Sequence, residues 1–193
     1  MAEAARLQAA LARPGGGSSD FDLNPGLHLP KDRVLRPAAV LVAVWGDRLL
    51  LTKRASHLKH HPGQIAFPGG KLDAGDASLE AAALREAREE VGLPEGAVEL
   101  WGRLPAHETV TGFSMTPILG RITRDFTPIP ERGEVDEVFT VPLDHVLNAD
   151  RYVIERRRWR GEWRSYYAVP YGPYYVWGAT ARILRGLAER VAG

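Results

Sequence analysis

The chain has 193 residues, of which 45% are hydrophobic and 25% charged, as expected for a soluble globular domain. Its formal net charge of +1 provides no global field that would favour nucleic acid or an anionic membrane. The absence of cysteine excludes disulfides, thiolate metal sites and a cysteine nucleophile, so any metal ion must be held by carboxylate, carbonyl or imidazole groups.

No segment predicts export or membrane insertion. The N-terminus carries Glu3 and Arg6 and lacks the apolar stretch of a secretory signal. No apolar run approaches the ~20 residues that a membrane-spanning helix needs. We therefore expect a cytoplasmic protein without a membrane partner; the sequence gives no signal for its oligomeric state.

The N-terminal part of the chain predicts little regular structure. Residues 2–12 favour a short helix, and the Pro-Gly-Gly-Gly-Ser-Ser sequence of residues 14–19 indicates a flexible linker. We expect the first ~12 residues to be weakly tied down, because chain termini fray. Residues 20–36 are interrupted by proline. We divide the chain into a lead-in, residues 1–36, and a single domain, residues 37–193.

Regular structure is predicted from residue 37 onward. Residues 40–45 form an apolar strand, Gly46 and Asp47 a two-residue turn, and residues 48–52 the returning strand of a hairpin. Residues 53–77 favour a loop. Residues 78–91 are rich in alanine and strongly favour a helix, which Asp76 or Ser78 can cap and which Gly92 and Pro94 end.

Further strands are expected near residues 97–104, 117–122, 135–140 and 163–169. Residues 143–148 suggest a short helix, and residues 176–191 a closing helix. Helices that punctuate a mainly β chain predict an α/β (α+β) fold with one sheet and flanking helices.

The helix predicted over residues 78–91 carries the strongest chemical signal. Glu86, Glu89 and Glu90 are spaced so that their carboxylates share one face. A plain solvated face, with Arg85 paired to Glu89, is the simpler alternative. Against it, Glu86 and Glu90 repel each other at i, i+4 and lie near the helix C-terminus, where acids are disfavoured. A divalent cation would reverse both penalties, and Mg²⁺ prefers carboxylate oxygen.

The loop that precedes this helix adds to the signal. Residues 67–71, Phe-Pro-Gly-Gly-Lys, form a rigid and then permissive turn. Paired glycines allow the backbone to approach a ligand or ion closely. A plain turn is the alternative for a Gly-Gly pair taken alone.

Together these residues resemble the Nudix box, Gly-x5-Glu-x7-Arg-Glu-apolar-x-Glu-Glu-x-Gly-apolar. Residues 85–93, Arg-Glu-Ala-Arg-Glu-Glu-Val-Gly-Leu, match its second half at every fixed position. The first half departs: counting back from Arg85 places Ala77 where the Glu belongs, whereas counting forward from Gly70 places Asp76 there, with one extra residue afterwards. The first acidic position is therefore Asp76 or absent, and we assign it no catalytic role.

A second resemblance concerns the segment upstream of the box. Residues 50–70 are similar to the signature of coenzyme A pyrophosphatases, in which Leu-Leu-Thr-x-Arg leads through a basic stretch to Gly-Gln-x-x-Phe-Pro-Gly-Gly. Lys59 departs from it, since an Arg is usual there, and this keeps the charge but loses the bidentate fork. Residues 112–117, 134–142 and 177–181 are also similar to that subfamily.

The resemblance implies a Nudix α/β/α sandwich with a mixed sheet. It also implies hydrolysis of coenzyme A to 4′-phosphopantetheine and adenosine 3′,5′-bisphosphate with Mg²⁺, or Mn²⁺ in its place. The implied metal ligands are Glu86 and Glu90, then Glu89, with the Gly70 carbonyl as a fourth. The candidates for the general base are Glu89, Glu134 and Glu137, and those for substrate binding are Arg54, Lys59, Gln64 and Lys71.

Two other functions remain open from the sequence. Another nucleoside diphosphate derivative, such as ADP-ribose or a dinucleotide, could be the substrate. The Arg-Arg-Arg-Trp-Arg run of residues 156–160, with Trp163, could instead make the chain a non-catalytic nucleotide- or RNA-binding module. An exposed hairpin explains the run more simply, and the near-neutral charge disfavours nucleic acid. The tyrosine-rich region 166–177 fits either core packing or a wall for adenine or pantetheine.

Overall fold

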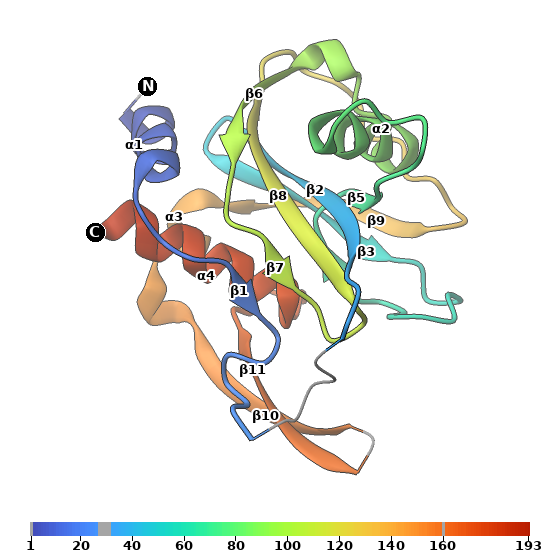
Figure 1. Cartoon of the computed structure of the whole chain (residues 1–193). Helices are drawn as coiled ribbons and strands as arrows, with labels where there is room; N and C mark the ends of the chain where they lie inside the picture. The colour runs from blue at the N-terminus through green and yellow to red at the C-terminus, as the bar shows by residue number, and fades with distance from the viewer. Residues whose placement is uncertain (1, 27–31, 160) are drawn as a thin grey trace.

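The computed structural model describes residues 2–26, 32–159 and 161–193 (Figure 1). Within these residues, nine strands form one mixed sheet whose main path runs β1-β7-β8-β2-β3-β4, and a separate antiparallel hairpin is formed by β10 and β11. The strands of the sheet are β1 (Ser18–Ser19), β2 (Arg36–Trp45), β3 (Arg48–Arg54), β4 (Ile65–Ala66), β5 (Gly69–Lys71), β6 (Val98–Arg103), β7 (His107–Glu108), β8 (Phe113–Ile122) and β9 (Val135–Pro142). The hairpin consists of β10 (Val153–Trp159) and β11 (Glu162–Ala168).

Helices cover both faces of the sheet (Figure 1). They are α1 (Ala2–Ala12), α2 (Leu79–Val91), the single turn α3 (Leu143–Val146) and α4 (Ala179–Ala192), with 3-10 turns at η1 (Glu95–Ala97) and η2 (Ala149–Arg151). Helix α2 lies on one face, and α1, α3 and α4 contribute to the core on the other. The predicted α/β sandwich with a mixed sheet and flanking helices is confirmed.

Strand β2 shows why the sheet is buried on both sides. Val40, Val42 and Val44 belong to the core under α4, and Ala39 and Leu41 to the core under α2. Because successive side chains of a strand point to opposite faces, only a continuous apolar run can fill both cores. The hairpin between β2 and β3 is also confirmed.

Helix α2 is fixed at both ends by its predicted caps. The Ser78 hydroxyl accepts a hydrogen bond from the Ala81 backbone N–H at 3.1 Å, so Ser78 and not Asp76 is the N-cap. Gly92 ends the helix with φ 71°, in the left-handed region that glycine tolerates. Ala82, Ala83 and Ala87 are buried against the sheet, where their small size lets the helix approach it closely.

The remaining predictions of regular structure are largely confirmed. The strands expected near residues 97–104, 117–122, 135–140 and 163–169 correspond to β6, β8, β9 and β11, and the helices to α3 and α4. The segment 53–77 is not entirely a loop, since it contains the short strands β4 and β5. No helix in the described part of the chain is long and apolar enough to cross a membrane.

The prediction that the first ~12 residues are weakly tied down is wrong. Leu7 and Ala10 are fully buried and belong to the core shared with α4. Arg190 of α4 also donates a hydrogen bond to the Arg13 carbonyl at 2.5 Å. Two apolar residues three positions apart share one face of α1, and α4 supplies the surface that buries them. The sequence alone does not reveal this contact, because the two helices lie at opposite ends of the chain.

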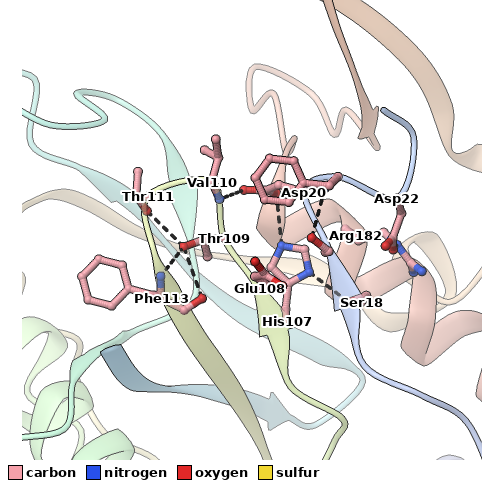
Figure 2. A network of polar contacts seen from close by, with 12 residues as sticks. Ser18, Asp20, Asp22, His107, Glu108, Thr109, Val110, Thr111, Phe113 and Arg182 are labelled. Carbon is pink, nitrogen blue, oxygen red and sulfur yellow. Dashed lines mark hydrogen bonds and ion pairs between the residues drawn. The ribbon is translucent and has the colours of Figure 1, made fainter. Parts of the chain in front are cut away.

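Residues 18–24 are attached to the sheet by a polar network (Figure 2). The buried His107 ring lies between the Ser18 hydroxyl, 2.9 Å from Nδ1, and an Asp20 carboxylate oxygen, 3.1 Å from Nε2. The second Asp20 oxygen accepts the Val110 N–H at 2.8 Å. The division of the chain at residue 37 remains a prediction about its organisation; part of the lead-in, residues 27–31, lies outside the described residues.

Replacing Asp20 by alanine is expected to lower the free energy of unfolding by about 1–3 kcal/mol, because the Val110 N–H and the buried His107 ring both lose their acceptor. Urea denaturation at constant m-value measures the change. The exposed Asp150 provides the matched control, and Asp150→Ala is expected to stay within about 0.5 kcal/mol of wild type. Equal stability of the two variants would contradict a structural role for the network.

Candidate active site

The paired glycines of β5 bring the backbone against two carboxylates of α2. The Gly69 N–H donates a hydrogen bond to Glu90 Oε2 at 3.0 Å. A Cβ atom at Gly70 would lie 2.4 Å from Glu86 Oε1, and one at Gly69 would lie 2.4 Å from the Ala39 carbonyl. A larger residue at Gly70 would therefore displace the Glu86 carboxylate, and one at Gly69 would displace the backbone of strand β2. The turn thus packs closely against the acidic face of α2; its approach to a ligand or ion stays a prediction.

Glu90, which is buried, and Glu86, which is partly buried, form a pair of acidic side chains on α2. Glu90 is only 5% exposed, and burial raises its pKa to about 8, with the charges of Glu86 and Glu134 contributing. Burial likewise raises the pKa of Glu86. Burial and neighbouring acids thus disfavour the ionised form of both carboxyl groups. The site is therefore prepared for a compensating positive charge.

Arg85 connects the remaining acids of this region. Its Nε and Nη2 atoms donate to the two Asp76 oxygens at 2.9 and 3.0 Å, while Nη1 donates to Glu86 at 3.0 Å and to Glu89 at 2.9 Å. The i, i+4 pairing of Arg85 with Glu89 that the sequence suggests is thus observed. The Asp76 side chain is only 5% exposed, and the guanidinium lowers its pKa.

Asp76 is the acid of this region to which the sequence assigns no catalytic role. Its carboxylate holds the Arg85 guanidinium with a bidentate pair of hydrogen bonds. The signal was the forward count from Gly70, which places an acid at the first acidic position of the box. The extra residue lies between Asp76 and Arg85, within residues 77–84, which contain the Ser78 cap and the start of α2.

The structure separates Glu134 from Glu137. Glu134 is exposed just before β9, and its charge raises the pKa of both Glu86 and Glu90. Glu137 instead accepts a hydrogen bond from the Tyr174 hydroxyl, and the Tyr174 ring stacks on Phe139 at 3.6 Å. Phe139 packs against the core under α4. Because Glu137 shares the strand face of Phe139, it lies on the side of the sheet opposite α2.

The predicted substrate-binding residues fall into two groups. Arg54 lies at the end of β3, where its charge lowers the pKa of Glu90, and its Nε atom is buried with no hydrogen-bond partner among the described residues. Gln64 lies beside α4, with Nε2 3.5 Å from where a Cβ at Gly178 would be. Lys59 and Lys71 are exposed, whereas the charge of Arg54 acts on Glu90 of the acidic pair.

Comparison with known proteins agrees with this geometry. The NUDIX domain family model matches residues 35–160. The chain belongs to the Nudix hydrolase family. Two relatives called "Uncharacterized Nudix hydrolase NudL", from Enterobacter sp. and Salmonella paratyphi B, are each 47% identical to this Nudix hydrolase over 81% of its length and 83% of theirs. A MutT/nudix family protein from Enterococcus faecalis shares the fold with a TM-score of 0.53 and 15% identity, over 87% of this chain and 66% of its own.

Nudix hydrolases cleave the diphosphate bond of nucleoside diphosphate derivatives and generally use divalent ions such as Mg²⁺. The acids of this Nudix hydrolase fit such an ion, since Glu90 is buried and Glu86 partly buried, both carry hard oxygen donors, and the charge of Glu86 helps to raise the pKa of Glu90. Among the described residues, no group of three His, Cys, Asp or Glu side chains forms a ready-made metal cage. Two carboxylates suffice for Mg²⁺, which usually retains waters and binds substrate phosphates.

The burial of Glu90 predicts a pH-dependent stability of the metal-free Nudix hydrolase. Its pKa of about 8 in the fold exceeds the ordinary value of 4.5, so between these values the folded chain binds more protons than the unfolded chain. The free energy of unfolding should therefore fall as the pH rises from 4.5 to 8.

Melting temperatures in excess chelator from pH 5 to 9 measure this effect. The melting temperature of wild type minus that of Glu90→Gln should fall across this pH range, because glutamine does not titrate. Added Mg²⁺ should reverse this fall near pH 8. A difference that is flat in pH would contradict the buried, protonated Glu90.

Proposed function

We propose that this Nudix hydrolase cleaves coenzyme A, or its acyl derivatives, to 4′-phosphopantetheine and adenosine 3′,5′-bisphosphate. The observation that supports this most is the position of Arg54. It belongs to the segment 50–70 that resembles the coenzyme A pyrophosphatase signature, and its unpartnered Nε lies near the acidic pair. A guanidinium there can donate to a diphosphate oxygen while Glu86 and Glu90 bind the neutralising cation.

In the proposed mechanism, Glu86 and Glu90 hold Mg²⁺ or Mn²⁺, with Glu89 and the Gly70 carbonyl as further ligands. When bound, the cation neutralises phosphate oxygens and acidifies the attacking water. Glu134 takes the water proton in preference to Glu89, which Arg85 holds, and to Glu137, which accepts a hydrogen bond from Tyr174. Arg54 orients the diphosphate, and Lys59, Gln64 and Lys71 contact outlying parts of the substrate.

One set of incubations tests the substrate. The enzyme is supplied with coenzyme A, dephospho-coenzyme A or ADP-ribose, with Mg²⁺ or with Mg²⁺ and excess chelator, and the products are identified by mass. We expect 4′-phosphopantetheine and adenosine 3′,5′-bisphosphate from coenzyme A, formed faster than the products from the other two and only without chelator. Preference for ADP-ribose or a dinucleotide would assign the other substrate class. Salt-sensitive RNA binding without hydrolysis would contradict an enzymatic role.

A further inference from the structure

The hairpin β10–β11 lies outside the main sheet, with which neither of its strands pairs, and projects from the body of the molecule (Figure 1). On one of its faces Arg157 and Arg164 lie directly opposite each other in the strand register. Like charges at such a position destabilise a hairpin unless something compensates for them. The Phe21 ring lies 5.8 Å from the Arg164 guanidinium carbon, and an anion bound at Arg157 would reduce the repulsion between the two arginines.

A cluster of aromatic rings begins beside Arg157. Its guanidinium carbon lies 4.7 Å from the centre of the Trp177 ring, and the Tyr166 ring lies 5.1 Å from Trp177. The Tyr166 and Tyr175 hydroxyls are 3.4 Å apart, and Tyr175 is 43% exposed. Rings held at the surface beside a cation provide both partners that a nucleotide needs: a stacking face for the base and a donor for phosphate.

This cluster borders the candidate active site. A Cβ atom at Gly178, which follows Trp177, would lie 3.5 Å from Gln64 Nε2. The Gln64 carbonyl in turn accepts a hydrogen bond from the Arg54 backbone N–H at 2.9 Å. Burial lowers the pKa of His61, and the charges of both Arg54 and Arg157 lower it further. His61 therefore lies close enough to both Arg54, beside the acidic pair, and Arg157, on the hairpin, for their charges to act on it.

We propose that Arg157 binds the phosphate on the ribose 3′ position of the substrate, with Tyr175, Tyr166 and Trp177 beside the adenine. This inference rests on the proposed function, because coenzyme A carries that phosphate and dephospho-coenzyme A does not. It makes the hairpin the part of the enzyme that distinguishes these two molecules. Single-stranded nucleic acid is the other ligand that arginine and aromatic residues suit, but the near-neutral net charge and the small extent of the cluster favour a single nucleotide.

The direct test measures binding of adenosine 3′,5′-bisphosphate and adenosine 5′-monophosphate by calorimetry at fixed ionic strength. Wild type should bind the bisphosphate more tightly. Arg157→Gln should weaken bisphosphate binding by about 10- to 100-fold, the effect of losing one hydrogen-bonded charge pair, and leave monophosphate binding within about twofold. Arg157→Lys should restore part of the difference.

Arg156→Gln is the matched control, because Arg156 is the neighbouring residue on the opposite face of the hairpin, over Trp163. It should bind both nucleotides as wild type does. Equal binding of the two nucleotides by wild type, or equal losses in Arg156→Gln and Arg157→Gln, would overturn the inference.

Hydrolysis of coenzyme A by wild type is assayed separately. If the bisphosphate is distinguished through Arg157 but coenzyme A is not cleaved, the proposed function fails and this inference stands; the reverse result rejects this inference alone.

Discussion

Glu90→Gln is expected to lower kcat/KM by about three orders of magnitude while the protein stays folded. Glutamine fills the same volume and its amide oxygen can still accept the Gly69 N–H, so the contact between β5 and α2 is kept. What is lost is one of the two carboxylates that we expect to compensate the charge of the cation. Stabilisation of phosphate charge by a bound cation is worth several kcal/mol, and about 1.4 kcal/mol corresponds to a tenfold change in rate.

Steady-state kinetics at saturating Mg²⁺, together with circular dichroism, measure this effect. Glu86→Gln should behave like Glu90→Gln. The matched control is Glu99→Gln, since Glu99 is a half-exposed glutamate whose partner is Arg121 at 2.8 Å on the surface of the sheet; its activity should stay within about twofold of wild type. A folded Glu90→Gln enzyme with near-normal activity would exclude Glu90 from the metal site.

The acidic face of α2 could be predicted from the sequence because the information is local. Helix periodicity places Glu86 and Glu90 on one face regardless of what surrounds the helix. The caps are equally local, since Ser78 and Gly92 flank the alanine-rich run. The same holds for the hairpin of β2 and β3, where a Gly-Asp turn separates two apolar segments.

What the sequence could not supply depends on contacts between distant segments. The burial of Leu7 requires α4, and the position of Asn24 requires β11, where it exchanges two hydrogen bonds with the Ser165 backbone at 2.9 and 2.8 Å. Glu134 and Glu137 were equivalent candidates because both precede or begin a predicted strand. Only the side chains around them, the acidic pair for one and Tyr174 for the other, distinguish the two.

The second large effect concerns Arg85, which we expect to position the acids without needing to touch the substrate. Arg85→Lys keeps the positive charge but removes the fork that joins Asp76, Glu86 and Glu89. Loss of a residue that orients metal ligands typically costs 10- to 100-fold in metal affinity or activity. We expect kcat/KM to fall by about that factor and the Mg²⁺ concentration for half-maximal activity to rise.

Arg88→Lys is the matched control, because Arg88 lies on the same helix and pairs only with Glu95, at 3.3 Å, among the partners found in the described residues. Its activity and Mg²⁺ requirement should remain those of wild type.

A purely structural role for Arg85 would lower the denaturation midpoint without changing the Mg²⁺ requirement. If Arg85 positions the acids, Asp76→Asn should raise the Mg²⁺ requirement too. The effects of Asp76→Asn and Arg85→Lys should then be less than additive in the double variant, because each removes the same contact. Such coupling would show that Asp76, despite the extra residue that separates it from Arg85, performs the task of the missing first glutamate.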